Sequence, residues 1–268
     1  MTALKIVSWN INSVRLRAPN VSAFVEEQSP DVVCLQETKC RDGEFPEKAF
    51  TEMGLPYLSM FGQGGGHHGV AIASKHPLEK IETPDLCREG HAHVQGVRVQ
   101  GIDIHNIYLP AGGDVPDPEK NEKFDHKLDF LARMKAAYQT GDGSDRPLIL
   151  VGDLNVAPHK NDVWSHTQLL KIVSHTPVET EALDAAREAG GFVDIARAAV
   201  PEGQKLYTWW SYRAKSWAAS NRGRRLDHIW ANAKAQALTD PADYKIHLAW
   251  RGGWKPSDHA PISTIMTV

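Results

Sequence analysis

The sequence predicts a single domain in which helices and about ten β-strands are layered around two sheets. Short apolar runs have the length of strands, whereas segments with helical spacing are few and widely separated. This order of elements is typical of α+β layering and not of a simple β–α–β repeat. A chain of 268 residues buries roughly three quarters of the surface that its unfolded form exposes. No linker interrupts it, so we expect one domain over residues 1–268.

The expected strands are short apolar runs that alternate with more polar segments. They cover Leu4–Trp9, Asp31–Leu35, Tyr57–Phe61, Gly69–Ser74, Val94–Val99, Ile102–Tyr108, Leu148–Val151, Leu226–Trp230, Tyr244–Trp250 and Ile262–Val268. Two pieces rich in glycine, proline or aspartate, Gly112–Pro118 and Thr140–Asp145, are short enough to be surface loops.

Helical spacing of apolar residues predicts one helix around Phe24 and a second from Phe124 to Tyr138. Two further helices are expected at Pro46–Met53 and Thr180–Ala189. The second of these should end at the glycine pair that follows it, because glycine is favoured just after a helix.

Composition indicates an ordinary soluble globular protein, with 41% hydrophobic and 24% charged residues. No apolar run approaches the roughly 20 residues of a membrane-spanning helix, and the first residues lack a signal-peptide pattern, so we expect a cytoplasmic protein without a membrane partner. Three cysteines without CxxC spacing predict neither a disulfide framework nor a zinc site. A net charge of −3 argues against a protein held to nucleic acid by its overall field and, taken alone, favours a small-molecule enzyme.

Apolar strands of this chain end repeatedly in a carboxylate, an amide, a phenol or an imidazole. Such groups are Asn10, Asn12, Gln36, Glu37, Tyr108, Asp153, Asn155, Asp227, Asp258 and His259. Side chains at the strand ends of a rigid sheet can converge at one edge of that sheet, so these groups are candidates for one site. Because residues i and i+2 share a face of a strand, Asn10 should point with Asn12 and Asp153 with Asn155. For each residue alone a structural role is an equal alternative, since Asp and Asn often flank strands in turns.

The chemistry open to these groups is narrow. The sequence has no Gly-x-Ser-x-Gly elbow, Walker A loop or dinucleotide fingerprint, so acyl transfer, nucleotide-driven work and hydride transfer lack support. Oxygen ligands suit a hard cation such as Mg2+ or Mn2+, and a histidine beside carboxylates suits proton transfer. Metal-assisted hydrolysis of a phosphate ester fits this set of side chains best.

Residues 204–226 form a basic segment with interleaved aromatic rings. The segment holds six basic residues, five aromatic residues and no acidic residue. Basic side chains bind phosphates and aromatic rings stack on bases, so this segment is predicted to face nucleic acid. Burial in the core is the alternative for single rings, and we expect it for Trp210 and Trp230.

Seven motifs, spread from Ser8 to Ile262, together resemble one known family. They are SWNINSVR, PDVVCLQETK, NIYLP, LVGDLNVAP, YTWWSYR, NRGRRLDHIW and KPSDHAPI. In this order they closely resemble the exonuclease III and apurinic/apyrimidinic (AP) endonuclease family, a branch of the DNase I-like endonuclease/exonuclease/phosphatase superfamily. The resemblance implies an α/β fold, a four-layer sandwich of two mixed β-sheets packed face to face with helices outside.

The same resemblance implies a Mg2+-dependent DNA-repair nuclease. Its expected activities are 3′–5′ exonuclease action on double-stranded DNA, AP endonuclease incision 5′ to abasic sites, or both, with 3′-phosphatase activity left open. The expected partner is double-stranded DNA with abasic sites or 3′ ends, bound by a monomer.

The resemblance further implies which residues lie at the Mg2+ ion, for which Mn2+ is an expected substitute. They are Asn10, Glu37, Asp153, Asn155, Asp258 and His259. Glu37 resembles the principal ligand and Asp258 an outer carboxylate. Asn10 and Asn12 match positions that assist the metal or the scissile phosphate.

The catalytic residues that the resemblance implies are Tyr108, Asp153, Asn155, Asp227 and His259. Tyr108 matches a tyrosine that contacts the phosphate. Asp153 matches the aspartate that orients or deprotonates the attacking water, which Asn155 steadies. His259 resembles the histidine that stabilises a phosphoryl oxygen. Asp227 matches its orienting carboxylate and should raise the pKa of that histidine through its charge.

The residues expected to contact DNA are Asn12, Trp209, Tyr212, Arg213, Lys215, Arg222, Arg224 and Leu226. Trp209 and Leu226 match walls of the pocket that accepts a flipped abasic sugar, and flipping costs less where the base is missing. Because the overall charge is slightly negative, binding to undamaged DNA should be modest and salt-sensitive.

Several features depart from the family pattern. Ala111 stands where members have Asn or Gln, and Arg224 replaces an apolar or aromatic wall residue. The segment GQGGGHHGV, with His67 and His68, is richer in glycine and is expected to be a loop before a strand. The stretch Val163–Thr176 lies where substrate preference is expected to be set.

Two other functions stay open from the sequence. One is an inositol-phosphate or sphingomyelin phosphodiesterase of the same superfamily, against which the basic aromatic segment weighs. The other is a non-catalytic DNA-binding protein, which should have lost catalytic positions that are all present here.

Overall fold

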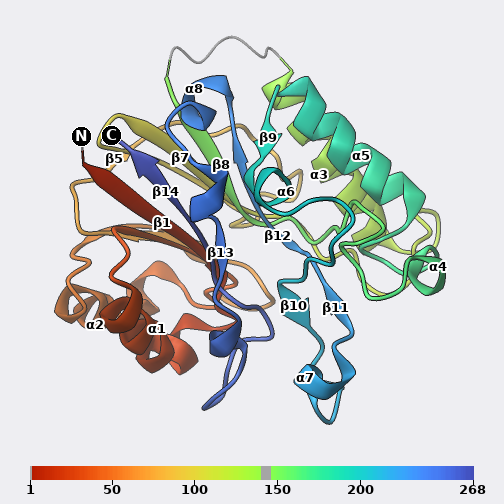
Figure 1. The fold of residues 1–268 in the computed structure, drawn as a ribbon, viewed down its shortest axis with the longest axis horizontal. Helices are drawn as coiled ribbons and strands as arrows, with labels where there is room; N and C mark the ends of the chain where they lie inside the picture. Colours follow the sequence, from red (N-terminus) through yellow and green to blue (C-terminus); the bar gives the residue numbers. More distant parts are fainter. Residues whose placement is uncertain (1, 140–145) are drawn as a thin grey trace.

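The computed structural model describes residues 2–139 and 146–268, so the loop predicted at Thr140–Asp145 lies outside the described residues. Two six-stranded sheets pack face to face with helices on both outer faces (Figure 1). The first sheet has the order β13 (Lys245–Ile246), β14 (Ile262–Thr267), β1 (Ala3–Asn10), β2 (Val32–Gln36), β4 (Val70–Ser74) and β3 (Tyr57–Phe61). The second has the order β5 (Glu79–Lys80), β6 (Val94–Val99), β7 (Ile102–Tyr108), β8 (Leu148–Asp153), β12 (Asp227–Ala231) and β9 (Val193–Asp194).

Both sheets are mixed. The pairs β1–β2 and β7–β8 are parallel, whereas their other neighbours are antiparallel. Every residue of β2, β4, β7, β8 and β12 is buried. Strands covered on both faces have no solvent side, which is why β2, β4 and β8 consist mostly of apolar residues.

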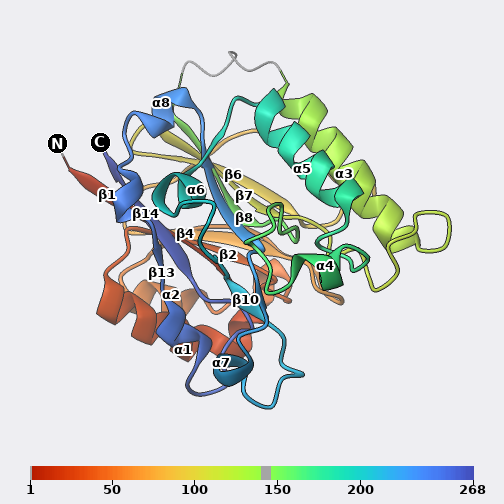
Figure 2. The ribbon, with the colours of Figure 1, turned by 45° about the vertical axis from the view of Figure 1, so that its right-hand side comes forward.

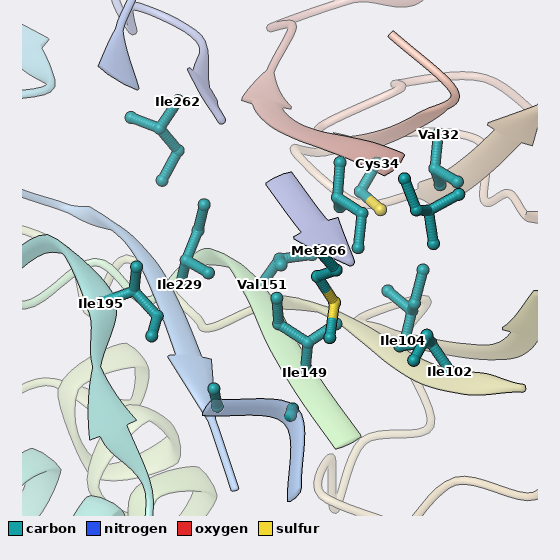
Figure 3. Packing of buried hydrophobic residues seen from close by; sticks show 14 of the residues in the cluster. Val32, Cys34, Ile102, Ile104, Ile149, Val151, Ile195, Ile229, Ile262 and Met266 are labelled. Atoms are coloured by element: carbon teal, nitrogen blue, oxygen red, sulfur yellow. The ribbon is translucent and has the colours of Figure 1, made fainter. Parts of the chain in front are cut away.

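Alternate side chains of a central strand such as β8 belong to two different cores. In β8, Ile149 and Val151 face the other sheet, whose residues Ile262 and Met266 belong to the same core (Figure 3). Leu148 and Leu150, which alternate with them, pack outward against helices. The central core between the sheets is therefore flanked by two outer cores, as the four-layer sandwich requires.

The long helices form the outer layers. The first sheet is covered by α1 (Val14–Gln28) and α2 (Glu47–Glu52), and the second by α3 (Glu122–Tyr138) and α5 (Pro177–Ala189) (Figures 1 and 2). A capping box between Thr176 and Glu179 starts α5, and Gly191, with a φ of 62°, follows its end. The four predicted helices are confirmed, with boundaries shifted by a few residues.

Short elements were not predicted, because a single helical turn or a pair of strand residues carries no periodic signal. They are α4 (His166–Leu169), α6 (Ile195–Ala199), α7 (Trp217–Ser220), α8 (Ala233–Gln236), β5, β9 and the ribbon of β10 (Trp209–Trp210) and β11 (Gly223–Arg224). The ribbon and α7 project from the sandwich in Figures 1 and 2.

The strand predicted over Tyr244–Trp250 is wrong for most of its length. Only β13 is a strand, and Leu248–Arg251 forms a 3-10 helix. The apolar spacing there reflects packing of Trp250 onto Trp9 and Phe24 in the core under α1. The three cysteines are free and buried. None of the helices in the described residues has the length and hydropathy of a membrane span.

Candidate active site

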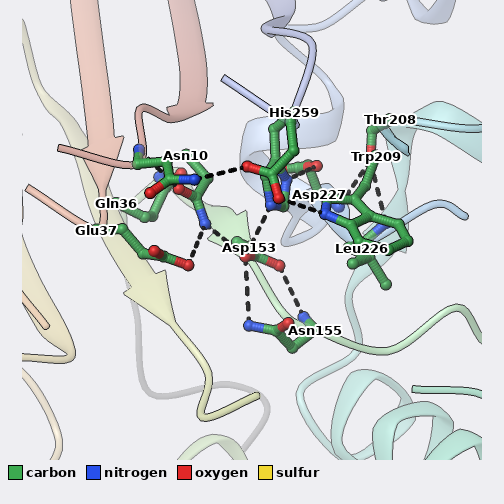
Figure 4. Close-up of polar contacts among 12 residues, drawn as sticks. Asn10, Gln36, Glu37, Asp153, Asn155, Thr208, Trp209, Leu226, Asp227 and His259 are labelled. Atoms are coloured by element: carbon green, nitrogen blue, oxygen red, sulfur yellow. Dashed lines mark hydrogen bonds and ion pairs between the residues drawn. The ribbon is translucent and has the colours of Figure 1, made fainter. Parts of the chain in front are cut away.

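The polar strand ends meet at one edge of the packed sheets. Strand β1 ends at Asn10, and β2 ends just before Glu37. Strands β7 and β8 end at Tyr108 and Asp153, which are partners in register. Strand β12 runs the other way, so it begins at Asp227 directly opposite Asp153. Figure 4 shows the side chains of Asn10, Glu37 and Asp153 directed toward one another.

The amide of Asn10 joins two carboxylates from different sheets. Its Nδ2 donates to Oε1 of Glu37 at 3.0 Å and to Oδ2 of Asp153 at 2.8 Å. Its Oδ1 accepts the backbone N–H of Asn12 at 3.0 Å. Asn10 is fully buried, so it holds both carboxylates in fixed positions while its own oxygen is engaged in a turn.

Cationic and N–H groups surround Glu37. Nζ of Lys39 lies 2.9 Å and Nδ1 of His67 lies 3.2 Å from its Oε2. Burial by itself raises the pKa of Glu37, but the contacts with His67, Lys39 and Asn10 outweigh it and lower the pKa to about 2. Glu37 is therefore ionised at neutral pH, as a ligand of a hard cation must be.

His259 lies between two buried aspartates. Its Nδ1 is 2.8 Å from Oδ2 of Asp227, and its Nε2 is 3.6 Å from Oδ2 of Asp153. Burial lowers the pKa of an imidazole, but the charges of Asp227 and Asp153 and the hydrogen bond with Asp227 more than offset it and raise the pKa of His259 to about 10. The upward direction confirms the prediction for Asp227. An imidazolium with protons on both nitrogens offers no lone pair to a metal, so this geometry favours a contact with phosphate.

Asp153 is buried and held by N–H donors. In addition to Asn10, the backbone N–H of Asn155 donates to its Oδ1 at 2.9 Å, and Nδ2 of Asn155 donates to its Oδ2 at 3.3 Å. Burial and the charges of Asp227 and Glu37 raise the pKa of Asp153 to about 7, although the charge of His259 opposes them. A fixed carboxylate with a near-neutral pKa can accept a proton from water at physiological pH.

Asn12 and Asn155 reach the site through turns and not through strand alternation. Both strands end before these residues, whose φ angles are 47° and 50°. In each turn the side chain of Asn10 or Asp153 accepts the N–H two residues further on. Asn155 does lie with Asp153, but the side chain of Asn12 turns to Asp258. Strand alternation was therefore the wrong reason for expecting these side chains to point together, because Asn12 and Asn155 lie in turns beyond the strands.

Asp258 connects the carboxylate cluster with the predicted DNA wall. Its Oδ1 accepts from Nδ2 of Asn12 and its Oδ2 accepts from Nε1 of Trp209, both at 2.9 Å. The half-buried indole of Trp209 is thereby fixed at the rim of the site.

Tyr108 supplies a neutral hydroxyl beside these charges. Burial, followed by the charges of Glu37 and Asp153, raises the pKa of the phenol well above its ordinary value. Tyr108 therefore stays protonated and can donate a hydrogen bond to a phosphate oxygen.

Two adjoining hollows open over the site. The smaller, of about 260 Å³, is lined by residues that include Glu37, Tyr108, Asn155, Asp258, His259, Trp209, Arg224 and Leu226. The larger, of about 690 Å³, is lined by residues that include Trp164, Trp209, Arg213, Arg222 and Arg224. Charged groups of the site and aromatic or basic walls therefore share one surface.

The other residues predicted to contact DNA occupy different places. Arg213 and Arg222 are exposed at the larger hollow, and Lys215 is exposed outside its lining. Tyr212 is half exposed, but its hydroxyl donates to the carbonyl of Pro256 at 2.7 Å, so it also anchors the segment that leads to the site.

Arg224 is tied to the wall of both hollows. Its Nη1 donates to the carbonyl of Val173 at 3.0 Å and to Oγ of Ser174 at 2.7 Å. The guanidinium also lies 5.3 Å from the ring centre of Trp209. Arg224 therefore links the stretch Val163–Thr176 to the aromatic wall and places its guanidinium at that wall.

Not every basic residue of the segment 204–226 faces outward, and the one that is buried was not among the expected DNA contacts. Arg225 is fully buried, with Nη2 2.9 Å from Asp162 and Nη1 2.7 Å from Asp194. Lys205 is exposed, but its ammonium donates to the backbone carbonyl of Val163. Sequence shows a charge but not its partner, which here comes from distant segments.

Some supporting residues were missed because they act through distant parts of the chain. Thr208 is fully buried, and its Oγ accepts the two backbone N–H groups at the start of β12 at 3.0 and 3.1 Å. Lys127 is buried against Glu179 at 2.5 Å and donates to the carbonyl of Asn155 at 2.8 Å. The sequence assigned no role to His67, which contacts Glu37.

Comparison with known proteins agrees with this geometry. The profile of the Endonuclease/Exonuclease/phosphatase family matches residues 7–259. The chain is 28% identical to exodeoxyribonuclease III of Haemophilus influenzae, over 97% of this chain and 98% of that protein.

Solved structures are similar over the whole fold. An AP endonuclease from Archaeoglobus fulgidus superposes with a TM-score of 0.90 at 32% identity, over 99% of this chain and 100% of that one. The 3′ phosphatase NExo from Neisseria, bound to a product DNA hairpin, gives 0.88 at 28% identity, with the same coverage. The chain therefore belongs to the Endonuclease/Exonuclease/phosphatase family, in its exonuclease III and AP endonuclease branch.

Proposed function

We propose that this chain is a Mg2+-dependent DNA-repair nuclease that hydrolyses phosphodiester bonds at abasic sites and 3′ ends of double-stranded DNA. The observation that carries the proposal is the smaller hollow, where Glu37 and His259 face the same space as Trp209 and Leu226. The names of the relatives support it, since they include an exodeoxyribonuclease, an AP endonuclease and a DNA-bound 3′ phosphatase.

The donor set fits a hard divalent cation at Glu37. That carboxylate is ionised and lines the hollow, and the carboxylate of Asp258 lines it as well. When bound, Mg2+ would supply positive charge to the phosphoryl oxygens during hydrolysis. Oxygen ligands from carboxylates favour Mg2+ or Mn2+ over softer metals.

The chain's own residues supply the remaining chemistry. Asp153 positions the attacking water and accepts its proton, since its pKa lies near neutrality. Asn155 and Asn10 hold the Asp153 carboxylate in place. The imidazolium of His259 donates to a phosphoryl oxygen and stabilises the negative charge that develops there.

The walls of the hollows account for recognition of DNA. Arg213 and Arg222 are placed to bind phosphates along the larger hollow. Trp209 and Leu226 provide an apolar surface against which a sugar without a base can pack. Arg224 adds a cation at the same wall and contacts the stretch in which we expect substrate preference to be set.

We further propose that the protein acts as a monomer in the cytoplasm. All groups of the site come from one chain, so catalysis needs no residue from a second copy. The three free thiols suit a reducing compartment.

The test compares three substrates in the presence of Mg2+ and then of EDTA. They are a duplex with an abasic-site analogue, an intact duplex with a recessed 3′ end, and an inositol phosphate. We expect Mg2+-dependent hydrolysis of both DNAs and none of the inositol phosphate. Cleavage of DNA in EDTA, or no cleavage of either DNA, would overturn the proposal.

A further inference from the structure

Five histidines line a third hollow, of about 390 Å³, and one of them, His67, is the residue that contacts Glu37. The other four have no part in the proposed reaction, and they are His68, His91, His93 and His126. The first precedes β4, the second and third precede β6, and the fourth lies in α3. Residues so far apart in the chain come together only through the fold. Tyr108 also lines this hollow.

The three histidines that lie closest have the spacing of a metal site. Ligand atoms of His68, His91 and His93 all lie within 4.8 Å of one another. The ring centres of His68 and His91 are 4.2 Å apart, and those of His68 and His93 are 5.3 Å apart. The ring of His126 lies 6.2 Å from those of His91 and His93.

A hydrogen bond orients His93 as it does a histidine in a metal site. Nδ1 of the buried His93 donates to the carbonyl of Tyr108 at 2.5 Å, which leaves its Nε2 with a lone pair. Nδ1 of His91 lies 3.2 Å from a carboxylate oxygen of Glu89 but forms no hydrogen bond among the described residues, and the same holds for the buried Nδ1 of His68. A ring nitrogen that donates to a carbonyl, with the other nitrogen free, is the usual state of a metal-ligating histidine, and His93 has it.

Burial favours the neutral form of His68, His93 and His126, which is the form that binds metals. Burial and the neighbouring histidines lower the pKa of His93 to about 3, although its bond to Tyr108 opposes them. Burial is also the main cause that lowers the pKa of His68 and of His126. The free lone pair on Nε2 of His93 can bind a cation but repels a phosphate oxygen, so a cation is the better fit.

We propose that His68, His91 and His93 bind one d-block divalent cation, with Zn2+ the best match. Imidazole nitrogens suit zinc, whereas Mg2+ takes oxygen ligands, so this site differs in chemistry from the one at Glu37. His126, Glu89 or a water molecule supplies the fourth position of a tetrahedral centre.

Such a metal would stiffen the segments that support the active site. His93 stacks on Tyr108, with ring centres 5.3 Å apart and planes at 17°. His67, next to His68, contacts Glu37. A Cβ at Gly66 would lie 2.8 Å from Nε2 of His68, so only glycine lets the chain approach that ring so closely. The metal would therefore fix the backbone behind both Tyr108 and Glu37.

Titration calorimetry with Zn2+, in excess Mg2+ that occupies the oxygen site, tests the proposal. We expect one Zn2+ per chain and a loss of affinity of about 100-fold or more in His91→Ala and in His68→Ala. His76→Ala, at a histidine outside the cluster, and Glu37→Gln, at the oxygen site, should bind Zn2+ as the wild type does. No binding by the wild type, unchanged binding in His91→Ala, or loss of binding in Glu37→Gln alone would each overturn the proposal.

Two further readouts guard against a variant that fails to fold. His91→Gln keeps a polar side chain of similar reach, and its thermal unfolding without metal should match that of the wild type. Zn2+ should then raise the unfolding temperature of the wild type but not that of His91→Gln. Co2+ in the wild type should show the intense visible absorption of a four-coordinate site. A weak, six-coordinate spectrum contradicts the assignment.

Discussion

The carboxylate of Asp227 lies 2.8 Å from Nδ1 of His259, and both side chains are buried. The second oxygen of Asp227 has no hydrogen-bond partner within residues 2–139 and 146–268. The negative charge therefore acts mainly on the imidazole, which it orients so that Nε2 faces Asp153. This relationship favours the protonated form of His259 at neutral pH.

Asp227→Asn should shift the pH dependence of hydrolysis. The Asp227 charge raises the pKa of His259 to about 10, against burial, so its removal lowers that pKa and His259 loses its proton at lower pH. We expect the alkaline limb of kcat/KM to move to lower pH and activity at neutral pH to fall about 100-fold. The profile is measured on the abasic duplex, with Asp240→Asn as a surface control. An alkaline limb that does not move would contradict the role of Asp227.

Asp153→Asn should abolish turnover while DNA affinity stays largely intact. The amide keeps the shape of the carboxylate but cannot accept a proton from water, and general-base catalysis contributes roughly 100- to 10,000-fold. Single-turnover rates and DNA binding are measured on the same preparation. The matched control is Asp129→Asn, at a partly exposed i,i+4 pair with Arg133. Near-normal rates in Asp153→Asn would contradict the assignment of Asp153 as the general base.

Arg213→Ala combined with Arg222→Ala should weaken binding to all duplexes and reduce its salt dependence. Each lost phosphate contact lowers the slope of log K against log salt by about 0.9, so the pair should lower it by about 1.8. Fluorescence anisotropy over a salt series measures the slope. Lys205→Ala is the control, because its ammonium donates to the carbonyl of Val163. An unchanged slope in the double variant would place these arginines outside the interface.

Arg225→Met should destabilise the fold and leave the salt slope of DNA binding unchanged. Arg225 is fully buried between Asp162 and Asp194, so its loss leaves two buried carboxylates less well paired. Breaking such a network costs about 3–5 kcal/mol. Urea unfolding measures the loss, with the exposed Arg222→Met as the control for side-chain size. Equal stability of the two variants would show that the network contributes little.

The local sequence predicted much of the fold and of the site. Long apolar runs with strand or helix spacing were placed correctly, because their periodicity is set by which faces are buried. The short strands β5, β9, β10 and β11 were not, since pairs of residues hold their geometry only through neighbours in space. The Tyr244–Trp250 prediction was wrong because a 3-10 helix packed in the core shows a similar apolar content.

The amino-acid sequence by itself determined the family and the chemistry of the reacting groups. Motifs such as LQETK, GDLN and SDHAP fix residue types at strand ends, and those types limit the reaction to metal-assisted hydrolysis. Only the tertiary structure decided which charges act on which partners. It buried Arg225 while leaving Arg222 exposed, turned Asn12 toward Asp258, and brought His68, His91 and His93 together. The physical reason is that burial, pKa and metal-ligand geometry depend on contacts between residues far apart in the chain.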